Sequence, residues 1–297
     1  MDRDDRDVKE YNRFGPWIFE ISDDDPVPPI FQPFADISVP FILSFKVPRP
    51  IERRQASPGM DLYDYLITLR EESLEILHRQ GNEVKKRTAA YTDILSIRCS
   101  QDLLHGTVSL FTGEKTYSFP FNTVSEEIID RMICFLLERF PRLESPREVE
   151  EEIGADEKKL GSHFNRLLNK ERRNDPQQRC FGAQGQVLVT SKDDSLVKRL
   201  WYGIIDKRTF ESLHFCDGQV LKILGRTPLY RYRGRVDYRV NKIYIPLVFL
   251  TGMEWNPDPR QQDVMILKYN AGQESFAFAI TRNNFETSLK YLRRLKL

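Results

Sequence analysis

Arginine and tyrosine alternate along one stretch of the sequence, between Arg226 and Lys242. On an extended strand, Arg231 and Arg233 would point to one face and the tyrosines beside them to the other. A turn at Gly234 would bring the following arginines back alongside. Paired guanidinium groups bind phosphate and carboxylate oxygens, so this pattern predicts a surface for an anionic ligand. The residues predicted to form this basic ribbon are Arg226, Tyr230, Arg231, Tyr232, Arg233, Arg235, Arg239 and Lys242.

The basic ribbon also has a purely structural interpretation. Arginines on a solvated strand cover apolar surface with their stems and pair with nearby acids. A mixture of basic and aromatic side chains can also stack on and neutralise single-stranded nucleic acid. The ribbon is short and the net charge of the chain is only +1, so nucleic acid is disfavoured. An acidic protein surface or an anionic lipid remains as the predicted partner.

A second basic cluster lies in the segment Lys46-Val-Pro-Arg-Pro-Ile-Glu-Arg-Arg. Its cations are Lys46, Arg49, Arg53 and Arg54. The proline spacing favours a polyproline II conformation, onto which a partner can dock. The simpler alternative is a linker that wraps a domain, and the sequence leaves both interpretations open.

No stretch of the sequence matches known catalytic machinery. It contains no GxSxG nucleophile motif, no P-loop, no GxGxxG and no HExxH motif. The four cysteines form no CxxC pair, and the acidic runs Asp23–Asp25 and Glu150–Glu152 lack the ligand spacing of a calcium loop. We therefore expect a protein that is not an enzyme, with no catalytic residue, metal or cofactor. A hydrolase with an unrecognised carboxylate pair is the alternative that only coordinates can test.

The chain length of 297 residues suggests about two domains, and a hydrophobic content of 40% is enough for a core in each. The acidic, polar start lacks the basic and apolar parts of a secretory signal. The longest apolar runs, near 128–137 and 243–250, are shorter than the ~20 residues of a membrane-spanning helix. We therefore expect a cytoplasmic protein without a transmembrane segment, attached at most peripherally to the inner face of a membrane.

Several elements must position these side chains. Alternation of apolar and polar residues predicts strands at 63–69, 73–77, 85–98, 106–111 and 115–121, with a turn at 80–82. Thr123 and Glu126 then fit a capping box, and the apolar stripe from Ile128 to Leu137 predicts an amphipathic helix. Before these strands, the proline-rich region 17–54 predicts an extended segment with short strands at 17–21 and 41–46. Residues 1–13 are expected to be frayed.

The same plan recurs in the C-terminal part of the chain. Strand patterns fall at 219–224, 229–233, 236–240, 245–253, 263–269 and 275–280, and a last helix is predicted from Asn283. The order of strand, tight turn, aromatic strand and helix that begins at 106 recurs from 263. Between the two parts, 142–180 is predicted to be a connector, with an amphipathic helix at 160–168.

Antiparallel strands closed by one C-terminal amphipathic helix resemble the pleckstrin-homology (PH-like) superfold. The resemblance covers 60–140 and 217–297. It is carried by the Tyr117/Phe119/Phe121 strand with the 128–137 helix, and by the Phe276/Phe278 strand with the 285–295 helix. It implies an α+β fold: two antiparallel bent-sheet sandwiches or barrels in tandem, each capped by a C-terminal amphipathic helix. Members of this superfold bind phosphoinositides or proteins, so the resemblance does not decide the function.

These patterns predict three parts of the chain. Residues 1–141 hold the proline-rich segment and a first PH-like domain with its core at 60–140, 142–180 form a helical connector, and 181–297 form a second PH-like domain. The predicted function is a non-enzymatic cytosolic adaptor or scaffold that binds an acidic protein surface or an anionic membrane lipid through the basic ribbon. A protein-only interaction module is the alternative.

Overall fold

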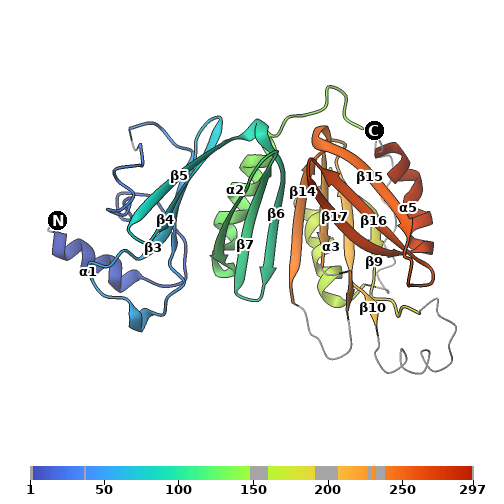
Figure 1. Ribbon diagram of the computed structural model, residues 1–297, viewed down its shortest axis with the longest axis horizontal. Coiled ribbons are helices and arrows are strands. Elements are labelled where there is room, and N and C mark those ends of the chain that lie inside the picture. Colours follow the sequence, from blue (N-terminus) through green and yellow to red (C-terminus); the bar gives the residue numbers. More distant parts are fainter. Residues whose placement is uncertain are drawn as a thin grey trace. The chain divides into compact units, whose positions relative to one another are not determined.

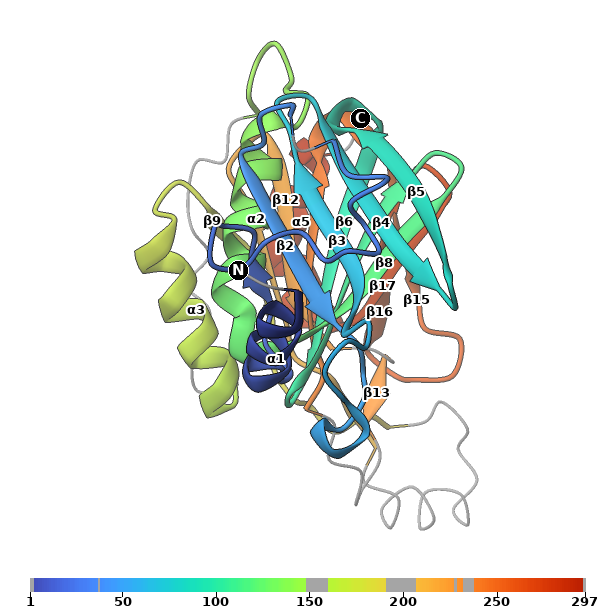
Figure 2. The same ribbon diagram turned by 90° about the vertical axis from the view of Figure 1, so that its left-hand side faces the viewer.

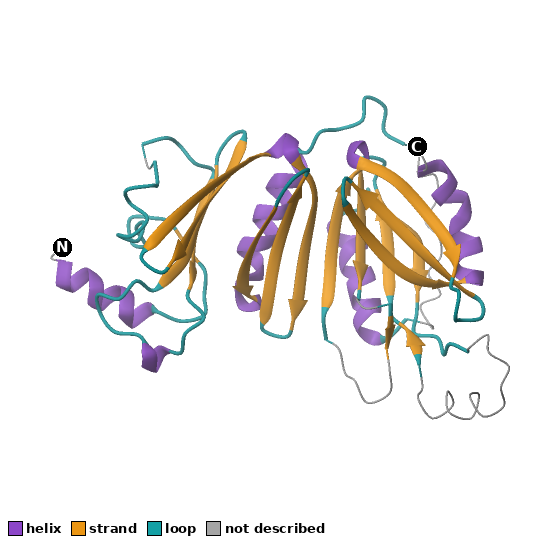
Figure 3. Cartoon of the chain, in the orientation of Figure 1, coloured by secondary structure: helices purple, strands orange, loops and turns teal. Residues whose placement is uncertain are grey.

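The computed structural model describes residues 3–36, 38–147, 160–190, 207–226, 229–231 and 238–295. The fold is mixed α and β, and its sheets are mostly antiparallel (Figures 1 and 3). This confirms the α+β class expected from alternating strand patterns and two amphipathic helices.

The described chain divides into two compact units. The first comprises 1–94, 103–108 and 117–140, and the second comprises 95–102, 109–116 and 141–297. Two stretches that the sequence placed in the first domain, 95–102 and 109–116, therefore group with the second unit. The finer division into two PH-like domains and a connector stays a prediction.

The first unit contains one five-stranded antiparallel sheet with the order β1-β2-β3-β4-β5, of which β2 to β5 are seen side by side in Figure 2. The short strands expected in the proline-rich region are confirmed as β1 and β2, and the alternating patterns as β3 and β4. The bounds are α1 (Arg3–Arg13), β1 (Phe19–Glu20), β2 (Leu43–Pro48), η1 (Arg53–Gln55), β3 (Tyr63–Leu69), β4 (Ser73–Gln80) and β5 (Glu83–Ala90).

The expectation of a frayed N-terminus is wrong, because 3–13 form the helix α1. Tertiary contacts hold this helix. Arg13 pairs with Asp25 at 2.8 Å, and Arg53 donates to the carbonyl oxygens of Asn12 and Phe14 at 3.0 and 3.1 Å. Such long-range partners are invisible to a pattern that registers only local charge.

The core of the first unit lies on both faces of the sheet. On one face, Phe14 and Phe31 pack with Tyr63, Leu66 and Leu77. On the other, the Phe45 ring lies 6.2 Å from the Phe119 ring, and Tyr91 meets Phe135 edge-on at 5.8 Å. The sheet is thus buried on both sides along β2 to β4, whereas the exposed residues gather on β5.

Three strands and a helix follow β5. The bounds are η2 (Tyr91–Asp93), β6 (Ile94–Asp102), β7 (His105–Thr112), β8 (Thr116–Asn122), η3 (Thr123–Ser125) and α2 (Glu126–Arg139). The capping box expected at Thr123 is wrong. Asn122 accepts from the Val124 amide at 3.0 Å, and the Thr123 hydroxyl donates to the Leu103 carbonyl instead. A 3-10 turn therefore precedes α2, which buries Ile129, Met132, Ile133 and Leu136 as the apolar stripe predicted.

The second unit contains a sheet in which β14 lies between β6 and β12, a three-stranded sheet β15-β16-β17 and the pair β10-β13. The connector helix and the last helix are confirmed as α3 and α5. The bounds are α3 (Ser162–Asn174), β9 (Arg179–Gln184), β10 (Arg208–Thr209), β11 (Ser212–Cys216), β12 (Val220–Gly225), β13 (Tyr230–Arg231), β14 (Val240–Pro246), η4 (Leu247–Phe249), β15 (Leu250–Pro257), β16 (Val264–Ala271), β17 (Glu274–Thr281) and α5 (Arg282–Leu295).

The order of elements repeats along the chain. The neighbouring strands β2-β3-β4-β5 lead through the 3-10 turn η2 to three strands and α2, and β9-β11-β12-β14 lead through η4 to three strands and α5. The sequence expected single strands at 85–98 and 245–253, but each is broken by a 3-10 turn. The break falls at Tyr91–Asp93 in the first case and follows Pro246 in the second.

Candidate functional site

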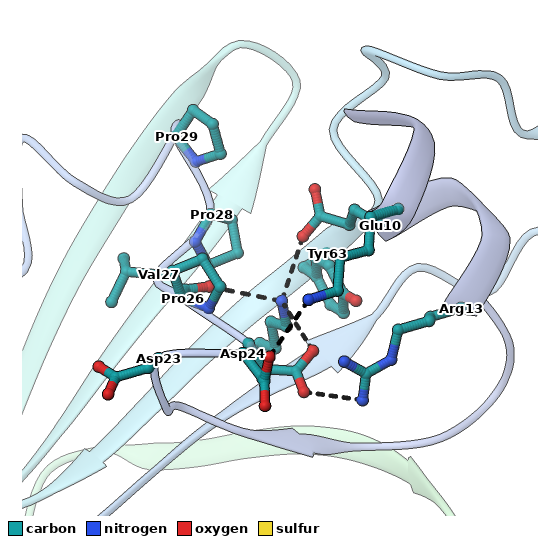
Figure 4. Close-up of a pocket in the computed structure, with 12 residues that line it drawn as sticks. Glu10, Arg13, Asp23, Asp24, Pro26, Val27, Pro28, Pro29 and Tyr63 are labelled. Carbon is teal, nitrogen blue, oxygen red and sulfur yellow. Dashed lines mark hydrogen bonds and ion pairs between the residues drawn. The ribbon is translucent and has the colours of Figure 1, made fainter. Parts of the chain in front are cut away.

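A pocket of about 310 Å³ opens in the first unit between α1, the loop at 23–29 and the strands β2 and β3 (Figure 4). Its volume is at the small end of the range for ligand sites in proteins. Three prolines and a valine supply its apolar wall. The residues that line it are Lys9, Glu10, Arg13, Asp23, Asp24, Asp25, Pro26, Val27, Pro28, Pro29, Lys46 and Tyr63.

The Lys46 side chain, only 2% exposed, lies at the centre of the charged groups of this pocket. Its ammonium donates to Glu10 Oε1 at 3.1 Å and to the Pro26 carbonyl at 3.4 Å, and lies 3.8 Å from Asp25 Oδ1. The Tyr63 ring centre lies 4.5 Å from the same nitrogen, a cation–π contact. A buried ammonium needs such partners because removal from water costs several kcal/mol.

The other pocket cations also have carboxylate partners. Arg13 pairs with Asp25 at 2.8 Å, and Lys9 pairs at 3.2 Å with the exposed Asp24. Burial raises the pKa of Tyr63 far above its usual value, and the carboxylates of Glu10 and Asp25 raise it further, so this phenol stays neutral. Each cation of the pocket thus has a carboxylate partner, and these ion pairs hold α1 and the 23–26 loop against β2.

A second surface, at the edge of the same unit, carries exposed cations instead. Tyr65 on β3 and His78 on β4 are stacked, with ring centres 4.2 Å apart and planes 6° from parallel. Lys85 lies directly opposite His78 on β5, and Arg87 lies two residues further along the same face. We call these four residues the β5 surface.

Lys85 and Arg87 are exposed, and within the described ranges neither forms an ion pair. Their positive charge affects the pKa of the neighbouring His78. Burial lowers the pKa of His78 below its ordinary value, and Arg87 and Lys85 lower it further, so the ring is neutral at pH 7. Burial likewise raises the pKa of Tyr65. The β5 surface is therefore a neutral aromatic pair beside two solvated cations.

The sequence contains a local signal for the cations of this surface. Glu83-Val-Lys-Lys-Arg-Thr follows the turn at 80–82 and contains three successive cations on a strand of low hydrophobicity. The turn at 80–82 is predicted from the sequence pattern, whereas an exposed basic surface on the strand that follows it is not. The stacking of Tyr65 on His78 has no local signal, because the two residues lie on different strands.

The described residues of the predicted basic ribbon lie on different strands and loops of the second unit. Tyr230 and Arg231 lie on β13, which pairs with β10, whereas Lys242 lies on β14 in the sheet that contains β6 and β12. Three members, Tyr232, Arg233 and Arg235, lie outside the described residues.

The described members of the ribbon contact other parts of the second unit. The Tyr230 hydroxyl donates to Asp258 Oδ2, and Arg231 donates to Gln186 at 3.1 Å. Lys242 is buried, with 6% of its surface exposed. Of the remaining two, Arg226 lies over the Phe164 ring at 5.5 Å, and Arg239 lies 3.8 Å from Asp102. These contacts match the structural interpretation of the ribbon more closely than an open anion site.

The second basic cluster is divided in the same way. Lys46 is buried in the pocket, and Arg49 donates to the Asp61 carbonyl at 3.1 Å. Arg53 holds the end of α1, and the exposed Arg54 pairs with Glu52 at 2.5 Å. The start of this segment belongs to the sheet strand β2, which ends at Pro48, and its last two arginines belong to η1.

One serine–histidine pair lies in the second unit. Ser212 Oγ is 3.0 Å from His214 Nε2, and Tyr269 Oη is 2.9 Å from His214 Nδ1. All three side chains are buried, with at most 2% of each residue exposed. The part of the chain that the structure describes contains no group of three or more His, Cys, Asp or Glu side chains placed to hold a metal ion.

No protein-family model matches the chain, and no curated protein matches it either. Among the described helices, none combines the length and the apolar character needed to cross a membrane.

Proposed function

We propose that this chain is a non-enzymatic adaptor that binds an acidic partner through the β5 surface. The observation that carries the proposal is the exposure of Lys85 and Arg87, with no ion-pair partner among the described residues, beside the stacked Tyr65 and His78. Carboxylate or phosphate groups would supply the partners that these cations lack.

This proposal keeps the chemistry predicted from the sequence and moves it to another strand. The cations of the pocket and the described members of the basic ribbon already have contacts inside the fold, and an incoming anion would compete with these contacts. Lys85 and Arg87 present no such competition. An exposed ion pair contributes only about 0.2–1 kcal/mol, so several contacts together are needed for useful affinity.

The architecture supports an adaptor with PH-like domains. When the two-residue strands β1, β10 and β13 are set aside, each half of the chain has four antiparallel strands, a 3-10 turn, three further strands and a helix in the same order. We propose that both halves are PH-like on this ground. A platform of this kind binds through its surfaces and edges, and the identity of the partner depends on the side chains displayed there.

The decisive experiment reverses the two cations. The double variant Lys85→Glu/Arg87→Glu is expected to bind a poly-glutamate peptide about tenfold more weakly than the parent at low salt, because attraction becomes repulsion. The difference should shrink as salt is added, since exposed charges are screened beyond about 10 Å at 0.1 M. Isothermal titration calorimetry at two salt concentrations measures both effects.

A matched control carries the same change in charge elsewhere. Lys115→Glu/Arg179→Glu alters two exposed cations outside the β5 surface and should bind the peptide as the parent does. Vesicles containing phosphatidylserine, tested in parallel, distinguish a lipid from a protein partner. Equal peptide binding by the β5 variant and the control would refute the proposal.

A further inference from the structure

The strand β5 is the last strand of its sheet. The order β1-β2-β3-β4-β5 leaves one side of β5 without a neighbouring strand among the described residues. All eight residues of β5 pair with β4, from Gln80↔Glu83 to Ser73↔Ala90. Five of its first six residues are exposed, as expected for a strand with a solvated edge. Open strand edges present amide and carbonyl groups to which another extended chain can bind.

The register identifies these groups. Gln80 and Glu83 close a two-residue turn, with Gly81 at φ +65°, and such closing residues form a hydrogen-bonded pair. Hydrogen-bonded and non-bonded pairs then alternate along an antiparallel ladder. At the far end, the Tyr91 amide donates to the Glu72 carbonyl at 3.1 Å, in agreement with this alternation. The amides and carbonyls of Val84, Lys86 and Thr88 therefore point away from β4.

The side chains of β5 determine which charge an added strand should carry. Lys85 and Arg87 lie on one face, and Lys86 lies on the other, 3.3 Å from Glu75. A second copy of this chain would place these cations against one another if the two β5 edges paired, which is unfavourable. An extended segment with alternating carboxylates would place acids opposite Lys85 and Arg87, where cross-strand pairs of opposite charge are favourable.

We propose that β5 binds an extended acidic segment of a partner protein as a sixth strand of this sheet. The inference rests on the proposed function for its charge selectivity and adds the backbone as the second binding element. Main-chain hydrogen bonds from Val84, Lys86 and Thr88 provide affinity, and Lys85 and Arg87 provide selectivity. Lysines on an edge strand can also prevent pairing, so the test must address the backbone itself.

Two substitutions at position 86 distinguish the contribution of the backbone amide from that of the side-chain charge. Lys86→Pro and Lys86→Ala remove the same cation, but only proline removes the outward amide, and edge strands accept proline where that amide faces solvent. With a synthetic peptide of alternating glutamate and valine, Lys86→Pro is expected to bind roughly fivefold more weakly than Lys86→Ala, because one backbone hydrogen bond is lost.

A second measurement remains valid if the proline variant does not fold. The same peptide, N-methylated at alternate residues, cannot complete the hydrogen-bond ladder with β5. It should bind the unaltered chain at least roughly fivefold more weakly than the unmethylated peptide does. Hydrogen exchange of the Val84, Lys86 and Thr88 amides should slow in the complex.

The outcomes separate the two proposals. If Lys85→Glu/Arg87→Glu weakens binding but N-methylation and proline have no effect, the partner binds by charge alone and strand addition is wrong. If the charge reversal also has no effect, the proposed function fails as well. Slowed exchange at the three outward amides together with sensitivity to N-methylation supports strand addition.

Discussion

His214 shows how burial decides the role of a residue with catalytic potential. Its ring lies between Ser212 and Tyr269, and the Phe278 ring meets it edge-on at 5.3 Å. Burial lowers the pKa of His214 to about 3, so the imidazole is neutral across the physiological range. One ring nitrogen donates and the other accepts in this state, which satisfies both hydroxyl neighbours. The pair is a hydrogen-bonded core element that substrate cannot reach.

The pKa of His214 predicts sensitivity to acid. The unfolded histidine titrates near 6.5 and the folded one near 3, so below pH 6.5 the unfolded chain binds more protons. The free energy of unfolding should therefore fall by about 1.4 kcal/mol per pH unit between these values. Urea denaturation at pH 7 and pH 5 measures the loss. The variant His214→Gln should lose about 2 kcal/mol less over this interval, and an identical loss in both proteins would contradict the assignment.

At the scale of the element, two turns depend on glycine for different reasons. Gly81 joins β4 to β5 at φ +65°, and a methyl group placed there would meet no atom within 4 Å. Gly218 joins β11 to β12 at φ +87°, and a methyl group there would lie 2.4 Å from the Arg147 carbonyl oxygen. The first turn requires only the left-handed conformation, whereas the second also requires close approach of two backbones.

Alanine substitutions should separate these two requirements. Gly81→Ala is expected to cost about 1 kcal/mol, the energy of a left-handed residue that carries a Cβ. Gly218→Ala should cost more, at least roughly 2 kcal/mol, because the Arg147 backbone must move as well. Thermal denaturation of both variants provides the comparison. Equal losses of stability in the two variants would show that the backbone near Arg147 can move without an energetic penalty.

At the scale of the whole molecule, strand pairing does not follow sequence order. β6 pairs with β14 over five residue pairs, from Val240↔Gln101 to Tyr244↔Ile97. Every residue of β14 is buried. The boundary expected near residue 141 therefore separates two strands that the sheet joins.

A fragment that ends at this boundary tests the importance of the pairing. Residues 1–141 alone would leave the β6 edge without β14, so we expect a lower melting temperature than the full chain and concentration-dependent association. Gel filtration and thermal denaturation measure both. When the fragment 142–297 is added, the two fragments should form a one-to-one complex that elutes at the volume of the full chain. A monomeric 1–141 fragment with unchanged melting temperature would argue that β14 is dispensable.

The sequence by itself determined the elements whose signal is periodic and local. Alternation predicted β3, β4, β16 and β17, and apolar stripes predicted α2, α3 and α5. These predictions succeed because the spacing of apolar residues within an element determines which side it buries. The proline-rich region was predicted to hold only short strands, since proline supplies no amide donor. The same local logic failed at α1, whose partners lie far along the chain.

Only the tertiary structure decided which charges are open to a ligand. Lys46 and Lys85 look alike in sequence, but Lys46 is buried against Glu10, 36 residues away, and Lys85 lies on the last strand of a sheet. The meaning of a cation depends on its burial and on the acids near it, and both follow from sheet order. Sheet order is set by contacts between distant residues, which no local pattern records.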